Sequence, residues 1–330
     1  MNETEAMALA LELATTPGVP LGPNPRVGCV LLRDGELLAQ GYHRGAGSPH
    51  AEVDALAHCA DPRGATAVVT LEPCNHHGRT GPCSLALIDA GVTRVVFALA
   101  DPNPVAAGGA ETLRAAGVDV AGRLLEDKAR AVNRAWLFGL THARPWVTWK
   151  FAASLDGRSA ASDGTSAWIT GPEARADVHR LRGQCDVILV GTGTVAVDDP
   201  LLTVRDGRSH QPLRAVIGLR TLDPEHRVFN HDGETVLLRT RDPAEALAEL
   251  YATGRRHVWL EGGPTVAAAF LRAGLVDEVI AYVAPVVLGA GPAAVADIGV
   301  DTINQALRLT LLDVTRVGGD VRLTLTPVPS

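Results

Sequence analysis

Short apolar runs alternate with helix-forming segments along this 330-residue chain, and the alternation restricts it to few folds. Such an order favours an α/β protein, in which helices cover a largely parallel sheet. Asp34-Gly35 separates two apolar runs and predicts a hairpin. Ser48-Pro49 predicts the start of a helix, with Ser48 as its N-cap. The elements expected in the first half are strands Val27–Leu32, Glu36–Gly41, Ala65–Leu71, Val95–Leu99 and Val118–Val120, and helices Glu5–Ala14, Ser48–Cys59, Ser84–Ala90 and Glu111–Ala116.

The pattern restarts in the second half, and the length suits about two domains. The stretch Trp136–Trp149 holds three of the five tryptophans and includes Pro145. We place a boundary there, near Ala143, which predicts domains of residues 1–143 and 144–330. The strands expected in the second half are Trp146–Ala152, Asp186–Val190, Ala215–Ile217, Thr235–Leu238, His257–Leu260, Val279–Val283 and Val321–Leu325, with a helix that follows Glu261-Gly262-Gly263-Pro264-Thr265 and ends at Arg272.

The net charge and the lengths of the apolar runs argue against a long nucleic acid or a membrane as the main partner. The formal net charge of −7 argues against a protein whose main partner is a long nucleic acid, because phosphate neutralisation needs a basic surface. The apolar run Val279–Leu288 is far shorter than the ~18 residues that a membrane span needs. The N-terminus carries acidic residues where a signal peptide is basic. We therefore expect a cytoplasmic protein that acts on small molecules.

The five cysteines do not suggest a disulfide framework, since they are few and odd in number. We expect three of them to be small buried side chains, namely Cys29, Cys59 and Cys185. Cys74 and Cys83 instead flank a polar loop that contains His76 and His77. Two thiols and two imidazoles within ten residues indicate a metal site.

A second motif lies upstream of this loop. His50-Ala51-Glu52 at a helix start, followed about twenty residues later by Pro73-Cys74, matches the zinc signature of nucleobase deaminases. That signature has one His and two Cys ligands, an open position for water and a carboxylate that relays protons. Here the second Cys follows at position 83, a longer gap than C-x-x-C. A structural zinc loop with His76 or His77 as ligands is the alternative; in the catalytic reading both histidines contact substrate.

Together these motifs make the chain resemble the bifunctional deaminase–reductases of riboflavin biosynthesis, over nearly its whole length. The long gap between Cys74 and Cys83 is the most specific part of the resemblance. The other matching segments are Pro23–Val30, Gly41–His43, His50–Glu52, Thr70–Cys83, Lys150–Arg158, Ser166–Thr170, Asp198–Arg205 and Glu261–Thr265.

The resemblance implies an N-terminal cytidine-deaminase-like three-layer domain and a C-terminal dihydrofolate-reductase-like domain. It implies zinc-dependent deamination of 2,5-diamino-6-ribosylamino-4(3H)-pyrimidinone 5′-phosphate, then NADPH-dependent reduction to 5-amino-6-(5-phosphoribitylamino)uracil. A homo-oligomer, a dimer or larger, is also implied. Matching positions make His50, Cys74 and Cys83 zinc ligands and Glu52 the proton shuttle. The implied reductase-substrate contacts are Ser166, Arg182, Leu202, Arg205 and Glu261, and the implied cofactor contacts are Ala152, Trp168, Thr194, Asp198, Gly263, Pro264, Thr265, Val266, Ala267, Ala268 and Ala269.

Without the resemblance, the reductase half carries weaker signals. Gly191-Thr192-Gly193-Thr194 lacks the full dinucleotide fingerprint, and no suitable helix is expected after it. The turn at Glu261–Thr265 can bind phosphate on the free N–H groups of a helix start, or can be an ordinary turn. Arg182 and Arg205 can clamp a sugar phosphate, or can be solvated charges. The competing functions are a nucleic-acid deaminase, a non-catalytic zinc module, and a chain with one working half.

Overall fold

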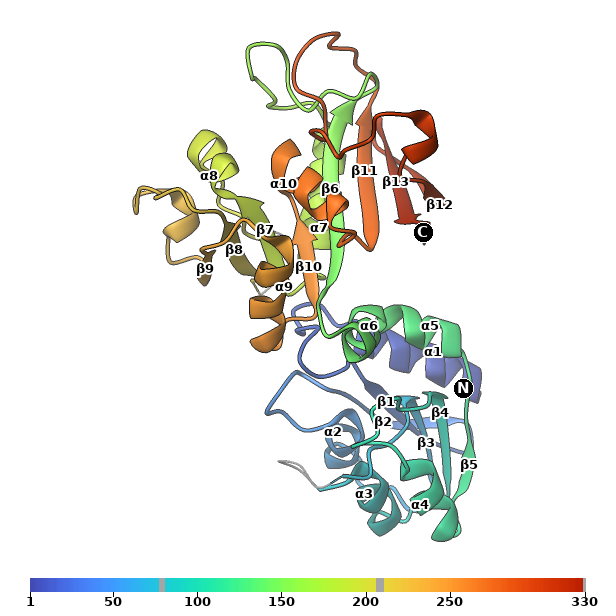
Figure 1. Cartoon of the computed structure of the whole chain (residues 1–330). Coiled ribbons are helices and arrows are strands. Elements are labelled where there is room, and N and C mark those ends of the chain that lie inside the picture. Colours follow the sequence, from blue (N-terminus) through green and yellow to red (C-terminus); the bar gives the residue numbers. More distant parts are fainter. Residues whose placement is uncertain (77–80, 206–210, 329–330) are drawn as a thin grey trace. The chain divides into compact units, whose positions relative to one another are not determined.

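The computed structural model describes residues 1–76, 81–205 and 211–328 (Figure 1). The chain forms two compact units, Met1–Thr141 and His142–Ser330, and each is described separately. None of the described helices is long and apolar enough to cross a lipid bilayer.

The N-terminal unit contains a five-stranded sheet in the order β2-β1-β3-β4-β5. Strand β1 pairs antiparallel with β2 and β3, whereas β3, β4 and β5 are mutually parallel. The elements are α1 (Glu3–Ala14), β1 (Gly28–Arg33), β2 (Glu36–Tyr42), α2 (Ala51–Ala57), β3 (Thr66–Leu71), α3 (Cys83–Asp89), β4 (Arg94–Leu99), α4 (Gly109–Ala115), β5 (Asp119–Ala121), α5 (Glu126–Val132) and α6 (Arg134–His142).

Helices cover both faces of this sheet, which makes three layers. Helices α1 and α5 pack on one face, and α2, α3 and α4 lie on the other (Figure 1). Gly41 in β2 allows α2 to approach closely, since a Cβ there would lie 2.3 Å from the backbone nitrogen of Ala55. Gly109 has the same role in α4, because its Cβ would lie 1.7 Å from the carbonyl oxygen of Pro73. These contacts set the positions of the two segments that carry the metal motif.

The C-terminal unit contains an eight-stranded sheet in the order β12-β13-β11-β6-β10-β7-β8-β9. The strands from β11 to β9 run parallel, and β13 and β12 add an antiparallel edge. The elements are β6 (Trp146–Ser154), α7 (Pro172–Arg182), β7 (Val187–Gly191), α8 (Thr192–Asp198), β8 (Leu213–Ile217), the 3₁₀ turn Arg227–Phe229, β9 (Thr235–Leu238), α9 (Pro243–Ala252), β10 (His257–Leu260), α10 (Pro264–Arg272), β11 (Glu278–Ala284), the 3₁₀ turn Ile303–Gln305, β12 (Leu309–Val317) and β13 (Asp320–Pro327).

Alternate side chains of the central strands enter two separate cores, as the two-residue period of a strand requires. In β7, Val187 and Leu189 pack with α9 and α10, whereas Ile188 and Val190 pack with α7. The core is mainly aliphatic, as expected from 4% aromatic residues.

The structure confirms the alternation and corrects several details. Helix α2 begins at Ala51 with His50 as its N-cap, rather than at Ser48. Helix α8 begins at Thr192, inside the glycine segment after which no suitable helix was clearly expected. The helices and strands not predicted from the sequence are α5, α6, α7, α8, α9 and the edge strand β12, and neither 3₁₀ turn was predicted.

Candidate functional site

Three metal-ligating side chains of the N-terminal unit converge from separate segments. His50 is the N-cap of α2, Cys74 follows the carboxyl end of β3, and Cys83 is the first residue of α3. Their ligand atoms all lie within 4.8 Å of one another. The cluster does not include His76, and His77 lies outside the described residues.

The donor atoms are spaced as a tetrahedral cation requires. His50 Nδ1 lies 3.2 Å from Cys83 Sγ and 3.5 Å from Cys74 Sγ. A tetrahedral Zn²⁺ with ordinary Zn–N and Zn–S bonds places nitrogen and sulfur about 3.6 Å apart. One nitrogen and two sulfurs also suit the chemistry of zinc, and three protein ligands leave a position for water.

The thiols of Cys74 and Cys83 interact with each other, and their pKa values shift in opposite directions. Hydrogen bonding with Cys83 and with His50 lowers the pKa of the Cys74 thiol to about 4. The hydrogen bond to Cys74, together with burial, raises the pKa of the Cys83 thiol above its ordinary value. Hydrogen bonding thus favours the thiolate form of Cys74, and a bound divalent cation would favour the thiolate form of both residues.

Glu52 lies in the first turn of α2, beside the ligand cluster but not within it. Only 4% of its surface is exposed, and burial raises the pKa of its carboxyl to about 7. A carboxyl with a pKa near neutrality can both accept and donate a proton at the working pH.

Of these residues, His50, Glu52 and Cys74 line one cavity of about 200 Å³. His76 also lies in its wall, and its buried Nδ1 has no hydrogen-bond partner among the described residues. Sequence reasoning gave no role to five further lining residues, which are Asn24, His43, Asp101, Asn103 and Trp136. The order of the sheet is the signal that could have identified two of them. Asp101 and Asn103 follow β4, the parallel neighbour of β3, so they emerge at the same edge as Cys74.

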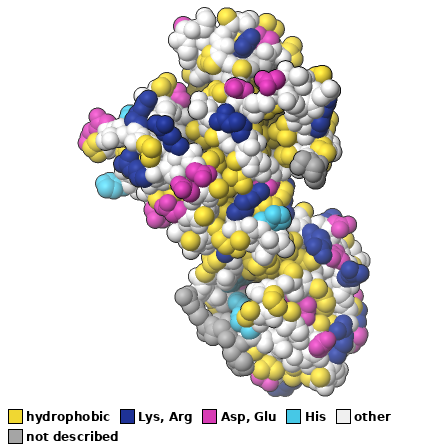
Figure 2. Space-filling view, in the orientation of Figure 1, with side chains coloured by type: hydrophobic (Ala, Val, Ile, Leu, Met, Phe, Trp, Pro, Cys, Tyr) yellow, Lys and Arg dark blue, Asp and Glu magenta, His cyan; other side chains and the backbone are white. Residues whose placement is uncertain are grey.

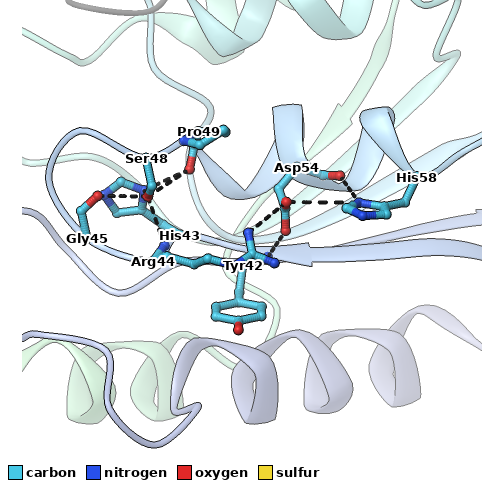
Figure 3. Close-up of polar contacts among 8 residues, drawn as sticks. All are labelled: Tyr42, His43, Arg44, Gly45, Ser48, Pro49, Asp54 and His58. Atoms are coloured by element: carbon cyan, nitrogen blue, oxygen red, sulfur yellow. Dashed lines mark hydrogen bonds and ion pairs between the residues drawn. The ribbon is translucent and has the colours of Figure 1, made fainter. Parts of the chain in front are cut away.

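Polar contacts beside the cavity attach α2 to the sheet (Figure 3). The carboxylate of Asp54 in α2 accepts hydrogen bonds from the backbone N–H of Tyr42 at 3.1 Å and from Arg44 at 2.7 Å. The carbonyl oxygen of Asp54 lies 2.7 Å from Nδ1 of His58. Asp54 thus stabilises the position of the helix that carries Glu52.

The same view shows His43 enclosed by a tight loop (Figure 3). Its Nδ1 lies 2.9 Å from the carbonyl oxygen of Pro49 and 3.3 Å from Oγ of Ser48. Burial lowers the pKa of its imidazole. Its ring meets that of His50 edge to face, with centroids 5.4 Å apart.

In the C-terminal unit, a cavity of about 670 Å³ opens at the carboxyl ends of β7, β8 and β10. Ligands of parallel α/β sheets bind at such ends. It is lined by seven of the residues implied for the cofactor, which are Thr194, Asp198, Gly263, Pro264, Thr265, Val266 and Ala269. Ala267 and Ala268 are buried in α10 and do not line it.

A second cavity of this unit, of about 530 Å³, is lined by Ser166, Arg182, Arg205 and Glu261. Ala152 and Trp168, implied for the cofactor, lie in its wall rather than in the wall of the first cavity. Leu202 is buried in the core that includes α7 and lines neither cavity.

Arg182 and Glu261 form a buried ion pair at the base of this second cavity. The Nε and Nη2 atoms of Arg182 each lie 2.5 Å from a carboxylate oxygen of Glu261. Burial opposes ionisation of Glu261, but Arg182, Lys150 and a hydrogen bond from Trp259 lower the pKa of its carboxyl to about 2. Lys150 is a further lining residue to which sequence reasoning gave no role, and burial lowers the pKa of its ammonium group.

The outer part of the second cavity is basic. Nη2 of Arg205 lies 3.2 Å from Nε2 of His179, and the guanidinium of Arg175 lies 4.8 Å from the ring centre of Trp168. Both arginines line the cavity. Elsewhere, basic and acidic side chains are interspersed within each unit on the face shown in Figure 2.

Each of the two units matches a known protein family. Residues 1–99 match the family model for the cytidine and deoxycytidylate deaminase zinc-binding region, and residues 145–323 match the RibD C-terminal domain. The riboflavin biosynthesis protein RibD of Mycobacterium tuberculosis is 49% identical over 328 residues, which cover 97% of this chain and 96% of the relative. RibD of Escherichia coli is 41% identical and covers 98% of this chain and 99% of the relative.

Solved structures share the whole two-domain fold. The diaminohydroxyphosphoribosylaminopyrimidine deaminase/5-amino-6-(5-phosphoribosylamino)uracil reductase of Thermotoga maritima superposes with a TM-score of 0.92 at 31% identity, covering 99% of each chain. RibD of Acinetobacter baumannii gives a TM-score of 0.90 at 38% identity, also covering 99% of each chain.

A deaminase domain with a zinc site, followed by a reductase domain, is the class of protein that the fold and the two sites define. The chain belongs to the RibD family and is a bifunctional deaminase and reductase of riboflavin biosynthesis. The predicted α/β fold class and the predicted pair of activities are therefore confirmed, and the zinc site is formed by His50, Cys74 and Cys83.

Proposed function

We propose that this chain deaminates 2,5-diamino-6-ribosylamino-4(3H)-pyrimidinone 5′-phosphate and then reduces the deaminated product with NADPH to 5-amino-6-(5-phosphoribitylamino)uracil. The observation that carries the first step is the cluster of His50, Cys74 and Cys83. His50 and Cys74 line one cavity together with the buried carboxyl of Glu52. Deamination is assigned to residues 1–143 and reduction to residues 144–330.

In the deaminase cavity, His50 Nδ1 and the sulfurs of Cys74 and Cys83 hold the zinc ion. When bound, Zn²⁺ lowers the pKa of a bound water so that hydroxide is available near neutral pH. The carboxylate of Glu52 would accept one proton from the attacking water and pass it to the pyrimidine ring nitrogen. It would then take the second proton from the same oxygen and give it to the amino group, which leaves as ammonia. The raised pKa of Glu52 suits both directions of transfer.

In the reductase unit, the larger cavity holds the dinucleotide, and backbone N–H groups at the start of α10 bind its phosphates. When bound, NADPH supplies the hydride that reduces C1′ of the ring-opened ribosyl chain. Gly263 has no Cβ, so a phosphate can approach its backbone closely. The space beside it is open, since among the described residues a Cβ there would contact only Oγ1 of Thr194, at 3.5 Å.

Substrate binding in the second cavity is divided between two arginines. Arg205 lies in the basic outer part and is assigned to the sugar phosphate. Arg182 has two of its nitrogens engaged by Glu261, so it acts together with that carboxylate rather than as a free clamp. Ser166 supplies a hydroxyl in the same wall.

Self-association is also proposed, as a homo-oligomer of two or more copies. Its support is the edge strand β12, where Leu311, Leu312 and Val314 are each more than half exposed. An apolar edge strand offers both side chains and unpaired backbone groups to a second copy. Light scattering on the purified chain measures its mass; a monomer at all concentrations would contradict this proposal.

The proposed reactions are tested by assaying each half separately. The purified chain should contain one zinc per polypeptide, release ammonia from the diaminopyrimidine phosphate, and oxidise NADPH only with the deaminated product. Absence of ammonia release from the zinc-loaded chain would contradict the assigned substrate. Ammonia release without NADPH oxidation would contradict the assigned reductase step.

A further inference from the structure

The segment that carries Arg205 is held by side chains rather than by backbone pairing. Residues 201–205 belong to no helix or strand, and none of them shares a backbone–backbone hydrogen bond with another described residue. Leu202, Thr203 and Val204 are nevertheless buried. Buried N–H and C=O groups need partners, so other groups must supply them here.

The amide of Gln211 supplies both partners of Val204. The backbone N–H of Val204 donates to Oε1 of Gln211 at 2.8 Å, and Nε2 of Gln211 donates to the carbonyl oxygen of Val204 at 2.8 Å. Two antiparallel strand residues exchange the same pair of hydrogen bonds. The Gln211 side chain therefore takes the place that a neighbouring strand would have beside Val204.

Arg214 holds the other end of the same segment. Its Nη1 donates to the carbonyl oxygen of Leu201 at 3.3 Å, and its guanidinium also binds Asn230 and the carbonyl oxygen of Gly233. Between the two anchors Leu202 has a φ of +52°, a left-handed conformation that is unfavourable for a residue with a side chain. The chain thus bends between two points that side chains fix.

Arg205 directly follows the point that Gln211 fixes. Arg205 lines the second reductase cavity, and Gln211 is not among the described residues that line it. We propose that Gln211 is a positioning residue of the reductase, which fixes the backbone of Val204 so that Arg205 meets the phosphate of the substrate. The proposal rests on the proposed role of Arg205 in binding the sugar phosphate. A guanidinium that is already in place costs less entropy on binding, so the effect should appear in KM.

Two other roles for Gln211 give different expectations. If its amide serves only folding, its loss should lower the unfolding temperature and leave every KM unchanged. If it contacts the substrate directly, its loss should impair substrates with and without the phosphate alike. A positioning role through Arg205 instead affects only the phosphorylated substrate and disappears once Arg205 is removed.

Substitutions at Gln211 test these roles. Gln211→Met keeps the length of the side chain but removes both hydrogen bonds. We expect it to raise the KM for the deaminated product roughly tenfold, with kcat within about twofold of wild type and the KM for NADPH unchanged. Gln211→Asn keeps the amide but is one carbon shorter, so it should raise the same KM. It keeps the proposal testable if Gln211→Met does not fold.

The matched control is a second glutamine that binds backbone groups. Oε1 of Gln305 accepts from the backbone N–H groups of Asp301 and Thr302, at 2.9 Å each, in an exposed turn. Gln305→Met also removes two hydrogen bonds, but it should leave every KM unchanged. Deaminase activity and the KM for NADPH report the folding of the two units in each variant.

Two further measurements connect Gln211 to Arg205. Arg205→Ala should raise the KM for the deaminated product at least as much as Gln211→Met does, and the double variant should add little. With the dephosphorylated form of the deaminated product, kcat/KM should be the same in wild type and in Gln211→Met.

The outcomes separate this proposal from the proposed function. A normal KM in the Gln211 variants, with Arg205→Ala impaired, would overturn the proposal and leave the phosphate site intact. Additive effects of Gln211→Met and Arg205→Ala, or an equal loss with the dephosphorylated substrate, would also overturn it. A normal KM in Arg205→Ala would instead contradict the phosphate site itself, and the proposal with it.

Discussion

The guanidinium of Arg182 and the carboxylate of Glu261 are joined by two hydrogen bonds of 2.5 Å, 79 positions apart in the sequence. Both side chains are largely buried, with 14% and 11% of their surface exposed. A buried carboxylate is stable only when it is paired and hydrogen-bonded. Two residues that line the second reductase cavity therefore also contribute to the folding stability of the C-terminal unit.

This pair predicts a specific loss of stability in acid. The pKa of Glu261 is depressed from 4.5 to about 2, so its contribution is fully present above pH 4.5. It should be lost as the pH falls from about 4.5 to about 2, by up to about 3 kcal/mol in the free energy of unfolding. Urea unfolding of the full chain across this range measures it. Glu261→Gln should abolish this pH-dependent part, and Glu234→Gln, at an exposed glutamate, should leave it intact.

Replacing Glu52, the proposed proton shuttle, should separate metal binding from catalysis. Glu52→Gln keeps the size of the side chain but cannot accept a proton, so deamination should fall by at least the ~10²–10⁴-fold that is typical of a lost general acid–base. Zinc content and reduction of the deaminated product should be unchanged, because Glu52 is not among the clustered ligands. Loss of zinc from this variant would instead make Glu52 a ligand.

The two reductase cavities should be separable by kinetics. Gly263→Val adds bulk at the start of α10, where we propose that the cofactor's phosphates bind, and should mainly raise the KM for NADPH. Arg205→Ala removes a cation from the other cavity and should mainly raise the KM for the sugar phosphate. Deaminase activity controls for folding. If Gly263→Val raised only the KM for the sugar phosphate, the cofactor would have been assigned to the wrong cavity.

The close packing of α2 on β2 should be essential to the metal site. A Cβ at Gly41 would lie 2.3 Å from the backbone nitrogen of Ala55 and 2.6 Å from the carbonyl oxygen of Ala51. Gly41→Ala should therefore displace α2, destabilise the chain by roughly 1–3 kcal/mol and weaken zinc binding. Thermal unfolding and zinc titration measure the two effects. The control Gly319→Ala, where a Cβ meets nothing within 4 Å, should change neither.

The zinc ligands could be predicted from the sequence because each lies at the end of a helix or strand that the sequence itself indicates. His50 lies at a helix start, and Cys74 and Cys83 flank a loop after a strand. The ligand types and their spacing therefore predicted a metal site without knowledge of the fold. The lining residues Asp101 and Asn103 required the sheet order, since only the pairing of β3 with β4 brings them beside Cys74.

Other features depend on tertiary contacts that no local pattern encodes. Helix α7 is largely polar, and Ala174 and Val178 are its buried residues, so its apolar face is small and gives only a weak signal in the sequence. Strand β12 is exposed along most of its length and lacks the alternation of a half-buried strand. The pairing of Arg182 with Glu261 joins α7 to the end of β10, and nothing in either segment alone predicts it.

The most direct test of the zinc site is the metal content of Cys83→Ser, measured together with deamination. Cys83 is fully buried, and its sulfur lies 3.2 Å from Nδ1 of His50. The variant should lose zinc and ammonia release but should still reduce the deaminated product. The control Cys59→Ser, at a half-buried cysteine outside the ligand cluster, should keep one zinc per chain and full activity. Full zinc retention with full deaminase activity in Cys83→Ser would contradict the assignment.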